Sequence, residues 1–279
     1  MSEPDGLSPL LSLMRRLRDP QHGCPWDRAQ DFASIAPYTI EEAYELAAAI
    51  ERGEPGPIRD ELGDLLFQVV FHAQLAEERD WFDFAQVARG IHDKLVRRHP
   101  HVFAGRGDGN LGELSRQWEE GKRAERAARG EVGVLTDVPL ALPALMRAAK
   151  LGRRAAQVGF DWPAADGARR KLDEELQEMD DAASACAVDP TRRAELEDEL
   201  GDVLFSVVNV ARLHGLDPEG ALRAANSKFE RRFAAMEKLA QEEGLSLEGM
   251  TPEDWEALWQ RAKQRLVLES SAGSSGSAC

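Results

Sequence analysis

The segment Asp60-Glu-Leu-Gly-Asp-Leu-Leu-Phe67 decides the fold, because it recurs almost unchanged as Asp198-Glu-Leu-Gly-Asp-Val-Leu-Phe205. A second motif repeats in the same order: Glu41-Glu-Ala-Tyr-Glu45 precedes the first segment, and Glu174-Glu-Leu-Gln-Glu178 precedes the second. The two motifs recur after 133 and 138 residues, and an internal repeat of this length indicates that the chain consists of two copies of one structural unit.

Hydrophobic residues follow the helical repeat around these segments. In the first copy Leu62, Leu65, Leu66, Val69 and Val70 recur at spacings of three and four residues, which is typical of an amphipathic helix. Ala, Leu, Glu and Arg dominate the composition and favour helices, whereas no stretch shows the sustained alternation typical of a half-buried strand. We therefore predict an all-α fold of two tandem helical bundle units.

The domain boundaries follow from the repeat and from the loop-forming residues between the copies. We predict an N-terminal unit over residues 1–129, a linker over 130–140 and a C-terminal unit over 141–269. The segment 270–279 is rich in Ser and Gly, so we expect it to be disordered.

Charge and cysteine content limit the partners and the compartment. The chain has 35 Lys and Arg against 50 Asp and Glu, a formal net charge of −15. This excess repels phosphate backbones and anionic lipids, so we expect neither nucleic acid nor a membrane as a partner. Cys24, Cys186 and Cys279 are scattered, and the N-terminus shows no secretion signal, which together predict a cytoplasmic protein.

The repeated acidic motifs predict a metal centre in each copy. In the first copy Glu42 and Glu45 lie one helical turn apart, as do Glu61 and Asp64 on the next predicted helix. If the two helices pair antiparallel, the four carboxylates converge and repel one another unless a cation binds. Ligands that are all carboxylate oxygens favour Mg²⁺, with Mn²⁺ possible. The second copy repeats the set as Glu175, Glu178, Glu199 and Asp202.

Two other interpretations of the acidic residues exist. An acidic motif on a helix is commonly a solvated face, but here the paired motifs occur twice and the second of each pair lies within an apolar helix. A di-iron carboxylate bundle requires Glu-x-x-His on two helices, and this chain contains no such motif. The pattern therefore favours a hard divalent cation.

The combined motifs resemble the MazG family of all-α nucleoside triphosphate pyrophosphohydrolases. The resemblance depends on EExxE followed by ExxD, and also on Cys24-Pro-Trp-Asp27, Gln117-Trp-Glu-Glu-Gly-Lys122 and Gly159-Phe-Asp-Trp162. It spans about residues 7–268 and matches the two-copy form of the family. One departure is Asp31-Phe32, where the family pattern has Thr-His.

The resemblance implies hydrolysis of a nucleoside triphosphate to the monophosphate and pyrophosphate, with Mg²⁺ activating water at the α-phosphorus. It implies that Glu174 acts as the general base beside the four metal ligands of the second copy, which are catalytic as well. The residues implied to bind the nucleotide are Lys171, Glu174, Glu195, Asp198, Lys228, Arg231, Arg232 and Trp259.

The two copies differ one helical turn before EExxE. Lys171 lies there in the second copy, whereas the first copy has Tyr38-Thr-Ile40. We predict that both copies bind metal and that the second is the catalytic one. The resemblance also implies association into a homodimer.

Three functions remain open at this point. The first is a housecleaning pyrophosphohydrolase that accepts canonical or aberrant nucleoside triphosphates. The second is a dUTP-specific or phosphoribosyl-ATP-specific pyrophosphohydrolase of the same superfamily. The third is a non-catalytic regulator that binds nucleotide or a protein partner.

Overall fold

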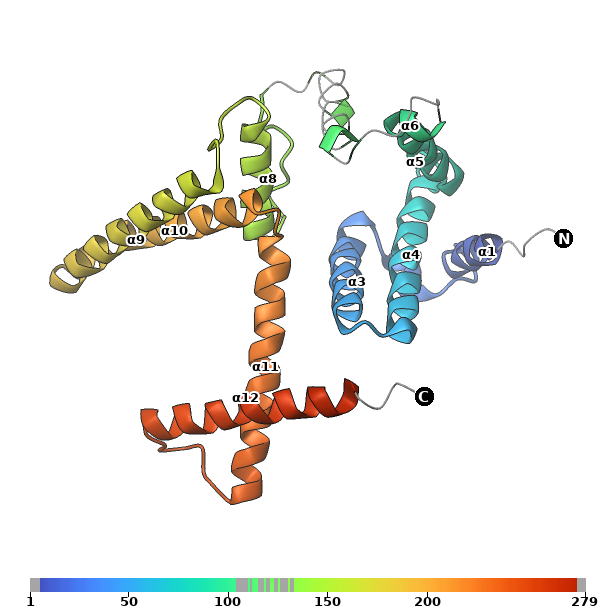
Figure 1. Cartoon of the computed structure of the whole chain (residues 1–279). Helices are drawn as coiled ribbons and strands as arrows, with labels where there is room; N and C mark the ends of the chain where they lie inside the picture. The colour runs from blue at the N-terminus through green and yellow to red at the C-terminus, as the bar shows by residue number, and fades with distance from the viewer. Residues whose placement is uncertain are drawn as a thin grey trace. The chain divides into compact units, whose positions relative to one another are not determined.

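The computed structural model describes residues 6–103 and 133–274, together with residues 110, 112–114, 118, 121, 122, 125 and 130. Helices, turns and loops account for all the described residues (Figure 1), and the all-α prediction is confirmed. The chain divides into two compact units, Met1–Arg129 and Gly130–Cys279, which we call unit 1 and unit 2. None of the described helices combines the length and apolar composition that a membrane span requires.

Unit 1 is built around a helical hairpin of α3 and α4, with α1 and α5 packed against α4 (Figure 1). Its described helices are α1 (Leu7–Leu17), α2 (Pro25–Ala29), α3 (Phe32–Arg52), α4 (Pro55–Glu77), α5 (Phe84–Arg98) and α6 (Pro100–Phe103).

The ends of α3 explain the hairpin. Asp31 caps the helix, because its side chain accepts a hydrogen bond from the Ser34 amide at 2.8 Å while the Ser34 hydroxyl accepts one from the Asp31 amide at 2.9 Å. The departure at Asp31-Phe32 therefore preserves a helix start. Gly53 ends α3 in the left-handed conformation (φ 71°), and Pro55 begins α4 two residues later. This short turn brings EExxE on α3 beside ExxD on α4.

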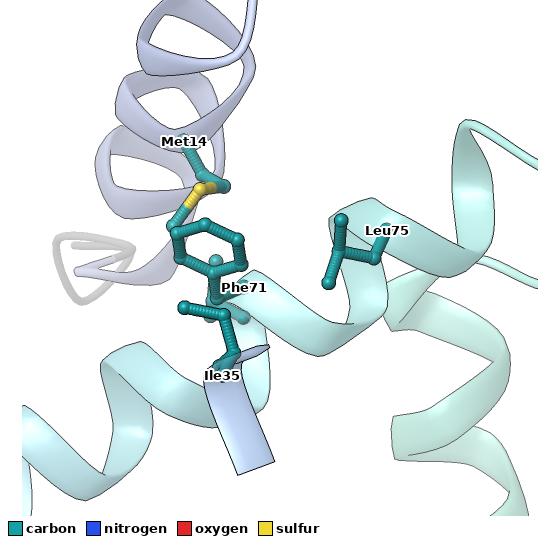
Figure 2. Close-up of a cluster of buried hydrophobic side chains, with 5 residues drawn as sticks. Met14, Ile35, Phe71 and Leu75 are labelled. Carbon is teal, nitrogen blue, oxygen red and sulfur yellow. The ribbon is translucent and has the colours of Figure 1, made fainter. Parts of the chain in front are cut away.

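The core of unit 1 lies where α1, α3 and α4 meet. Met14, Ile35, Phe71 and Leu75 lie at this junction and, together with Val70, are almost fully buried (Figure 2). Burying a side chain of this size contributes about 1.5–3 kcal/mol, so this small cluster fixes the hairpin against α1.

Unit 2 contains a second hairpin, formed by α9 and α10, with α8 packed against α10. Its described helices are α8 (Ala144–Ala156), α9 (Ala165–Val188), the 3₁₀ helix η1 (Pro190–Arg192), α10 (Arg193–Leu213), α11 (Pro218–Glu243) and α12 (Pro252–Ser274). A separate apolar cluster joins α11 to α12 through Met236, Ala240, Leu258 and Ala262.

An arginine connects each hairpin to the segment that precedes it, and unit 1 has a second, exposed ion pair between Arg15 and Glu77 at 3.4 Å. In unit 1 Arg18, which follows α1, donates to both carboxylate oxygens of Glu78 at 2.7 Å and also to the backbone oxygens of Asp27 and Gln30. In unit 2 Arg212 near the end of α10 donates to both oxygens of Asp161 at 2.9 and 2.6 Å. In unit 1 the basic partner comes first along the chain, whereas in unit 2 the acidic partner comes first.

Helix α12 continues through Ser274, into the segment 270–279 for which we expected disorder. Ala and Ser are tolerated in helices, so a Ser- and Ala-containing stretch extends an existing helix at little cost. Residues 275–279 lie outside the described part of the chain. The 130–140 linker and the exact unit boundaries remain predictions.

Candidate metal and nucleotide site

Three carboxylates from each hairpin lie close together. In unit 1 oxygens of Glu42, Glu45 and Glu61 all lie within 4.8 Å of one another, and we call this group cluster 1. In unit 2 oxygens of Glu175, Glu178 and Glu199 meet the same limit and form cluster 2. The helical spacing on α3 or α9 supplies two members, and the antiparallel partner helix supplies the third.

The fourth acidic residue of each predicted set lies outside these groups. Asp64 and Asp202 are exposed, one turn beyond Glu61 and Glu199. Asp64 still acts on cluster 1, because its charge helps to raise the pKa of Glu42. Roles for Asp64 and Asp202 as ligands remain predictions.

Like charges and partial burial make cluster 1 unfavourable in its fully ionised form. Burial raises the pKa of Glu42, and the charges of Asp64, Glu45 and Glu61 raise it further. The pKa of Glu61 is raised by burial and by the neighbouring Glu45 charge. Carboxylates gathered in this way gain from a proton or a cation that offsets the repulsion.

Cluster 2 differs because a lysine lies against it. The Lys171 ammonium is 2.7 Å from Glu174 Oε1 and 2.9 Å from Glu175 Oε1. The Glu175 side chain is only 7% exposed, whereas that of Lys171 is 36% exposed, so the buried carboxylate meets the ammonium at the edge of the solvent. The hydrogen bond between Glu178 and the Glu175 carboxylate raises the pKa of Glu178, whereas the Lys171 charge opposes the rise.

The donor set of both clusters fits a hard divalent cation. All the converging atoms are carboxylate oxygens, which suit Mg²⁺, Mn²⁺ or Ca²⁺. Glu174, the predicted general base, is exposed beside cluster 2 and shares Lys171 with Glu175.

The structure places the remaining nucleotide-binding residues in two other groups. On α10 Glu195 pairs with Arg192 at 2.5 Å, and Asp198 is exposed. On α11 Lys228 and Arg231 are exposed, while the Arg232 guanidinium lies over the Trp259 ring at 6.0 Å.

Trp259 belongs to the apolar contact between α11 and α12. It is half-buried, and its ring centroid is 5.5 Å from that of Phe229. Within the described part of the chain, no hydrogen bond or ion pair joins this group to cluster 2. Base stacking by Trp259 and phosphate binding by Lys228, Arg231 and Arg232 remain predictions.

Unit 1 contains an arginine pair at the position equivalent to Arg231 and Arg232. Arg97 and Arg98 both donate to the Glu125 carboxylate, from Arg97 Nη2 at 2.6 Å and from Arg98 Nη2. These hydrogen bonds lower the pKa of Glu125 to about 2. The sequence did not predict this contact, because Glu125 lies 27 residues beyond Arg98 and carries no local pattern.

The glycines inside the repeated segments have open space around them. No atom lies within 4 Å of where a Cβ would stand at Gly63 or Gly201. No described residue therefore packs closely against the backbone at these two glycines.

The chain matches the family model of the MazG nucleotide pyrophosphohydrolase domain twice, over residues 30–103 and 166–235. The matched regions contain α3 and α4 in unit 1, and α9 and α10 in unit 2, so each includes one acidic cluster.

Several curated proteins resemble nearly the whole chain. It is 49% identical over 258 residues to a nucleoside triphosphate pyrophosphohydrolase of Escherichia coli K12, covering 92% of this chain and 97% of that protein. It is 45% identical over 254 residues to the nucleoside triphosphate pyrophosphohydrolase/pyrophosphatase MazG of Thermotoga maritima, covering 91% and 94%. With two copies of the domain and relatives aligned from end to end, this chain belongs to the MazG family of nucleotide pyrophosphohydrolases.

Proposed function

We propose that this chain is a nucleoside triphosphate pyrophosphohydrolase that releases pyrophosphate at cluster 2 with a bound divalent cation. The observation that supports this most directly is the convergence of Glu175, Glu178 and Glu199 within a matched MazG domain, in a chain 49% identical to a named pyrophosphohydrolase.

Glu175, Glu178 and Glu199 would hold the cation, with Asp202 as a further ligand one turn along α10. When bound, Mg²⁺ or Mn²⁺ would neutralise phosphate charge and lower the pKa of a coordinated water. Glu174 lies on the exposed side of the cluster and accepts the proton of the attacking water. The water oxygen bonds to the α-phosphorus, the bond to the bridging oxygen breaks, and pyrophosphate leaves.

Basic and aromatic side chains then complete the nucleotide site. Lys171 is already within 3 Å of two carboxylates of this region and is placed to contact a phosphate. Lys228, Arg231 and Arg232 provide further positive charge for the triphosphate, and Trp259 provides a ring for the base. Glu195 and Asp198 complete the proposed nucleotide contacts on α10.

The finer parts of the proposal concern substrate and location. We propose a housecleaning role on canonical or aberrant nucleoside triphosphates, in the cytoplasm, with Mg²⁺ as the cation and no nucleic-acid or membrane partner. A dUTP-specific or phosphoribosyl-ATP-specific enzyme is the competing assignment. A non-catalytic regulator is disfavoured by the intact cluster 2.

Homodimer formation is supported by apolar surface on the cluster-bearing helices. Leu62 and Leu66 on α4, and Leu200 and Leu204 on α10, each expose 41% or more of their surface. Exposed apolar side chains in contiguous patches mark interaction surfaces. Light scattering should give twice the mass of the chain, and a monomer at micromolar concentration contradicts this part.

The test of the activity is pyrophosphate release from a panel of canonical and damaged nucleoside triphosphates. Release should require Mg²⁺ or Mn²⁺ and should stop in excess chelator. Turnover that persists in chelator, or products other than monophosphate and pyrophosphate, overturns the proposal. The panel also distinguishes the broad enzyme from the dUTP- or phosphoribosyl-ATP-specific alternatives.

A further inference from the structure

Each unit contains an ion pair that the other unit lacks at the equivalent position. In unit 2 Lys171 neutralises part of cluster 2. The equivalent residue of unit 1, three positions before Glu41, is Tyr38, whose ring packs edge-on against Trp26 at 6.1 Å. Cluster 1 therefore has no such lysine.

The arginine pairs show the opposite pattern. In unit 1 Glu125 accepts hydrogen bonds from both Arg97 and Arg98. Counting from the aligned tryptophans Trp118 and Trp259, the position of Glu125 corresponds to Leu266, which has no charge. In the described part of unit 2, no carboxylate lies within ion-pair distance of Arg231 or Arg232.

We propose that Lys171 and Glu125 act as internal counter-ions that make the two units bind different forms of the metal. Unit 1 takes the bare divalent cation and excludes triphosphate from its arginine pair. Unit 2 takes the cation together with a triphosphate. This proposal rests on the proposed function, because it assumes that the clusters bind metal and that the arginine pairs bind phosphate.

The argument for unit 2 is electrostatic. A cation that binds Glu175 must compete with an ammonium that is already 2.9 Å from this buried carboxylate. Without phosphate, the displaced Lys171 loses its partners. With a triphosphate present, the ammonium exchanges one anion for another, so metal and phosphate bind with positive coupling, and the coupling is reciprocal.

In unit 1 the internal counter-ion is an anion, and it occupies the arginine pair instead of the carboxylate cluster. Glu125 provides carboxylate oxygens to two guanidinium groups, the geometry that a phosphate would use. The Arg98 side chain is 12% exposed and that of Glu125 is 19% exposed, so a phosphate must displace a partly buried ion pair. Among the described residues, cluster 1 has no lysine in contact with its carboxylates and is influenced by the Arg52 charge at Glu61, which does not outweigh the effects that raise the pKa of Glu61.

The first experiment measures Mn²⁺ binding alone by electron paramagnetic resonance of the free ion. We expect Lys171→Gln to tighten Mn²⁺ binding in unit 2 by about five- to tenfold, the low end of the range that such couplings usually show. Tyr38→Lys should weaken binding in unit 1 by a similar factor. Arg169→Gln is the matched control, because it removes a positive charge from α9 that pairs with Asp173 rather than with cluster 2.

Adding inorganic triphosphate tests the coupling. In the wild type, triphosphate should strengthen Mn²⁺ binding in unit 2 after the Mn²⁺ that free triphosphate chelates has been subtracted. Lys171→Gln should reduce this gain in affinity. If Lys171→Gln weakens Mn²⁺ binding or leaves it unchanged without triphosphate, the proposal is overturned, while metal-dependent turnover of the wild type leaves the proposed function standing.

The second experiment tests Glu125 with triphosphate titrated calorimetrically. Glu125→Gln should bind one more triphosphate per chain than the wild type, and Glu113→Gln, at an exposed position, should not. Circular dichroism verifies that each variant keeps its helices. A folded Glu125→Gln protein with the wild-type stoichiometry overturns the assignment for unit 1.

Discussion

The two units retain the same carboxylates but not the same supporting contacts. Glu42, Glu45 and Glu61 correspond in type and position to Glu175, Glu178 and Glu199. The ion pairs that connect each hairpin to the segment before it lie at different positions, since Glu78 aligns with Leu216 and Arg212 aligns with Gln74. A structural ion pair can be replaced by one elsewhere, whereas a ligand to a cation must remain an anion in its place. The comparison therefore separates the residues that we propose to bind a cation from those that only support the fold.

The cores differ in the same way. Phe71 on α4 is fully buried against Met14, whereas the equivalent position on α10 is Asn209. Asn209 approaches Gly152 on α8 so closely that a Cβ there would lie 2.8 Å from its Oδ1. In unit 1, large apolar side chains thus join α1 to α4. In unit 2, α8 and α10 instead approach each other closely at Gly152.

The strongest test of the comparison is the loss of one ligand from each cluster. Glu175→Ala should lower kcat for pyrophosphate release by at least about a hundredfold, because it removes a buried residue that we propose as a metal ligand and leaves Lys171 with Glu174 alone. Glu42→Ala should retain most of the activity. Steady-state kinetics on one good triphosphate provides the measurement.

Helix content by circular dichroism is the control for both variants. It should change little, since removing one carboxylate relieves repulsion within a cluster. Equal inactivation by Glu42→Ala would mean that the units are equivalent or interdependent in catalysis.

Helical spacing and a short turn allowed the sequence to predict four neighbouring carboxylates in each copy, and three of each set lie together in the structure. The Gly53-to-Pro55 turn and the spacing of Glu42 and Glu45 suffice to bring Glu61 alongside. The sequence did not predict the Arg97–Arg98–Glu125 contact, because that depends on tertiary packing. Lys171 was noticed as a difference between copies, but its pairing with Glu175 required the structure.

The next largest effect concerns the ion pairs that connect each hairpin to the segment before it. Arg18→Met should destabilise unit 1 by about 3 kcal/mol, because Glu78 then keeps only the 3.3 Å hydrogen bond from Gln74 and the Gln30 carbonyl oxygen loses its side-chain donor. Arg212→Met should cost about 2 kcal/mol in unit 2, where Asp161 still accepts a bond from the Trp162 amide. Urea unfolding followed by circular dichroism measures both, and a larger loss for Arg212→Met contradicts the ranking.

A smaller effect is expected from metal on stability. A ligand that binds only the native state stabilises it by about 1.4 kcal/mol at ten times its dissociation constant. Mg²⁺ should therefore raise the melting temperature of the wild type. A variant with glutamine in place of all six cluster glutamates should not respond, and an equal rise in both proteins would indicate binding elsewhere.

The smallest expected effect is a pH dependence of stability that changes sign with metal. The pKa values of Glu42 and Glu61 are raised in the folded state, so in chelator the native protein binds more protons than the unfolded chain as the pH falls from neutral toward 5. These groups therefore make unit 1 more stable on acidification over that range. With Mg²⁺ bound, the same protons compete with the cation, and acidification removes stability.

In unit 2 Lys171 opposes the raised pKa of Glu178, so the response there should be weaker. The measurement is the difference in melting temperature between pH 5 and pH 7, with and without Mg²⁺. Glu61→Gln should change this difference more than Glu178→Gln does. The reverse order would mean that Lys171 does not compensate the charge of cluster 2.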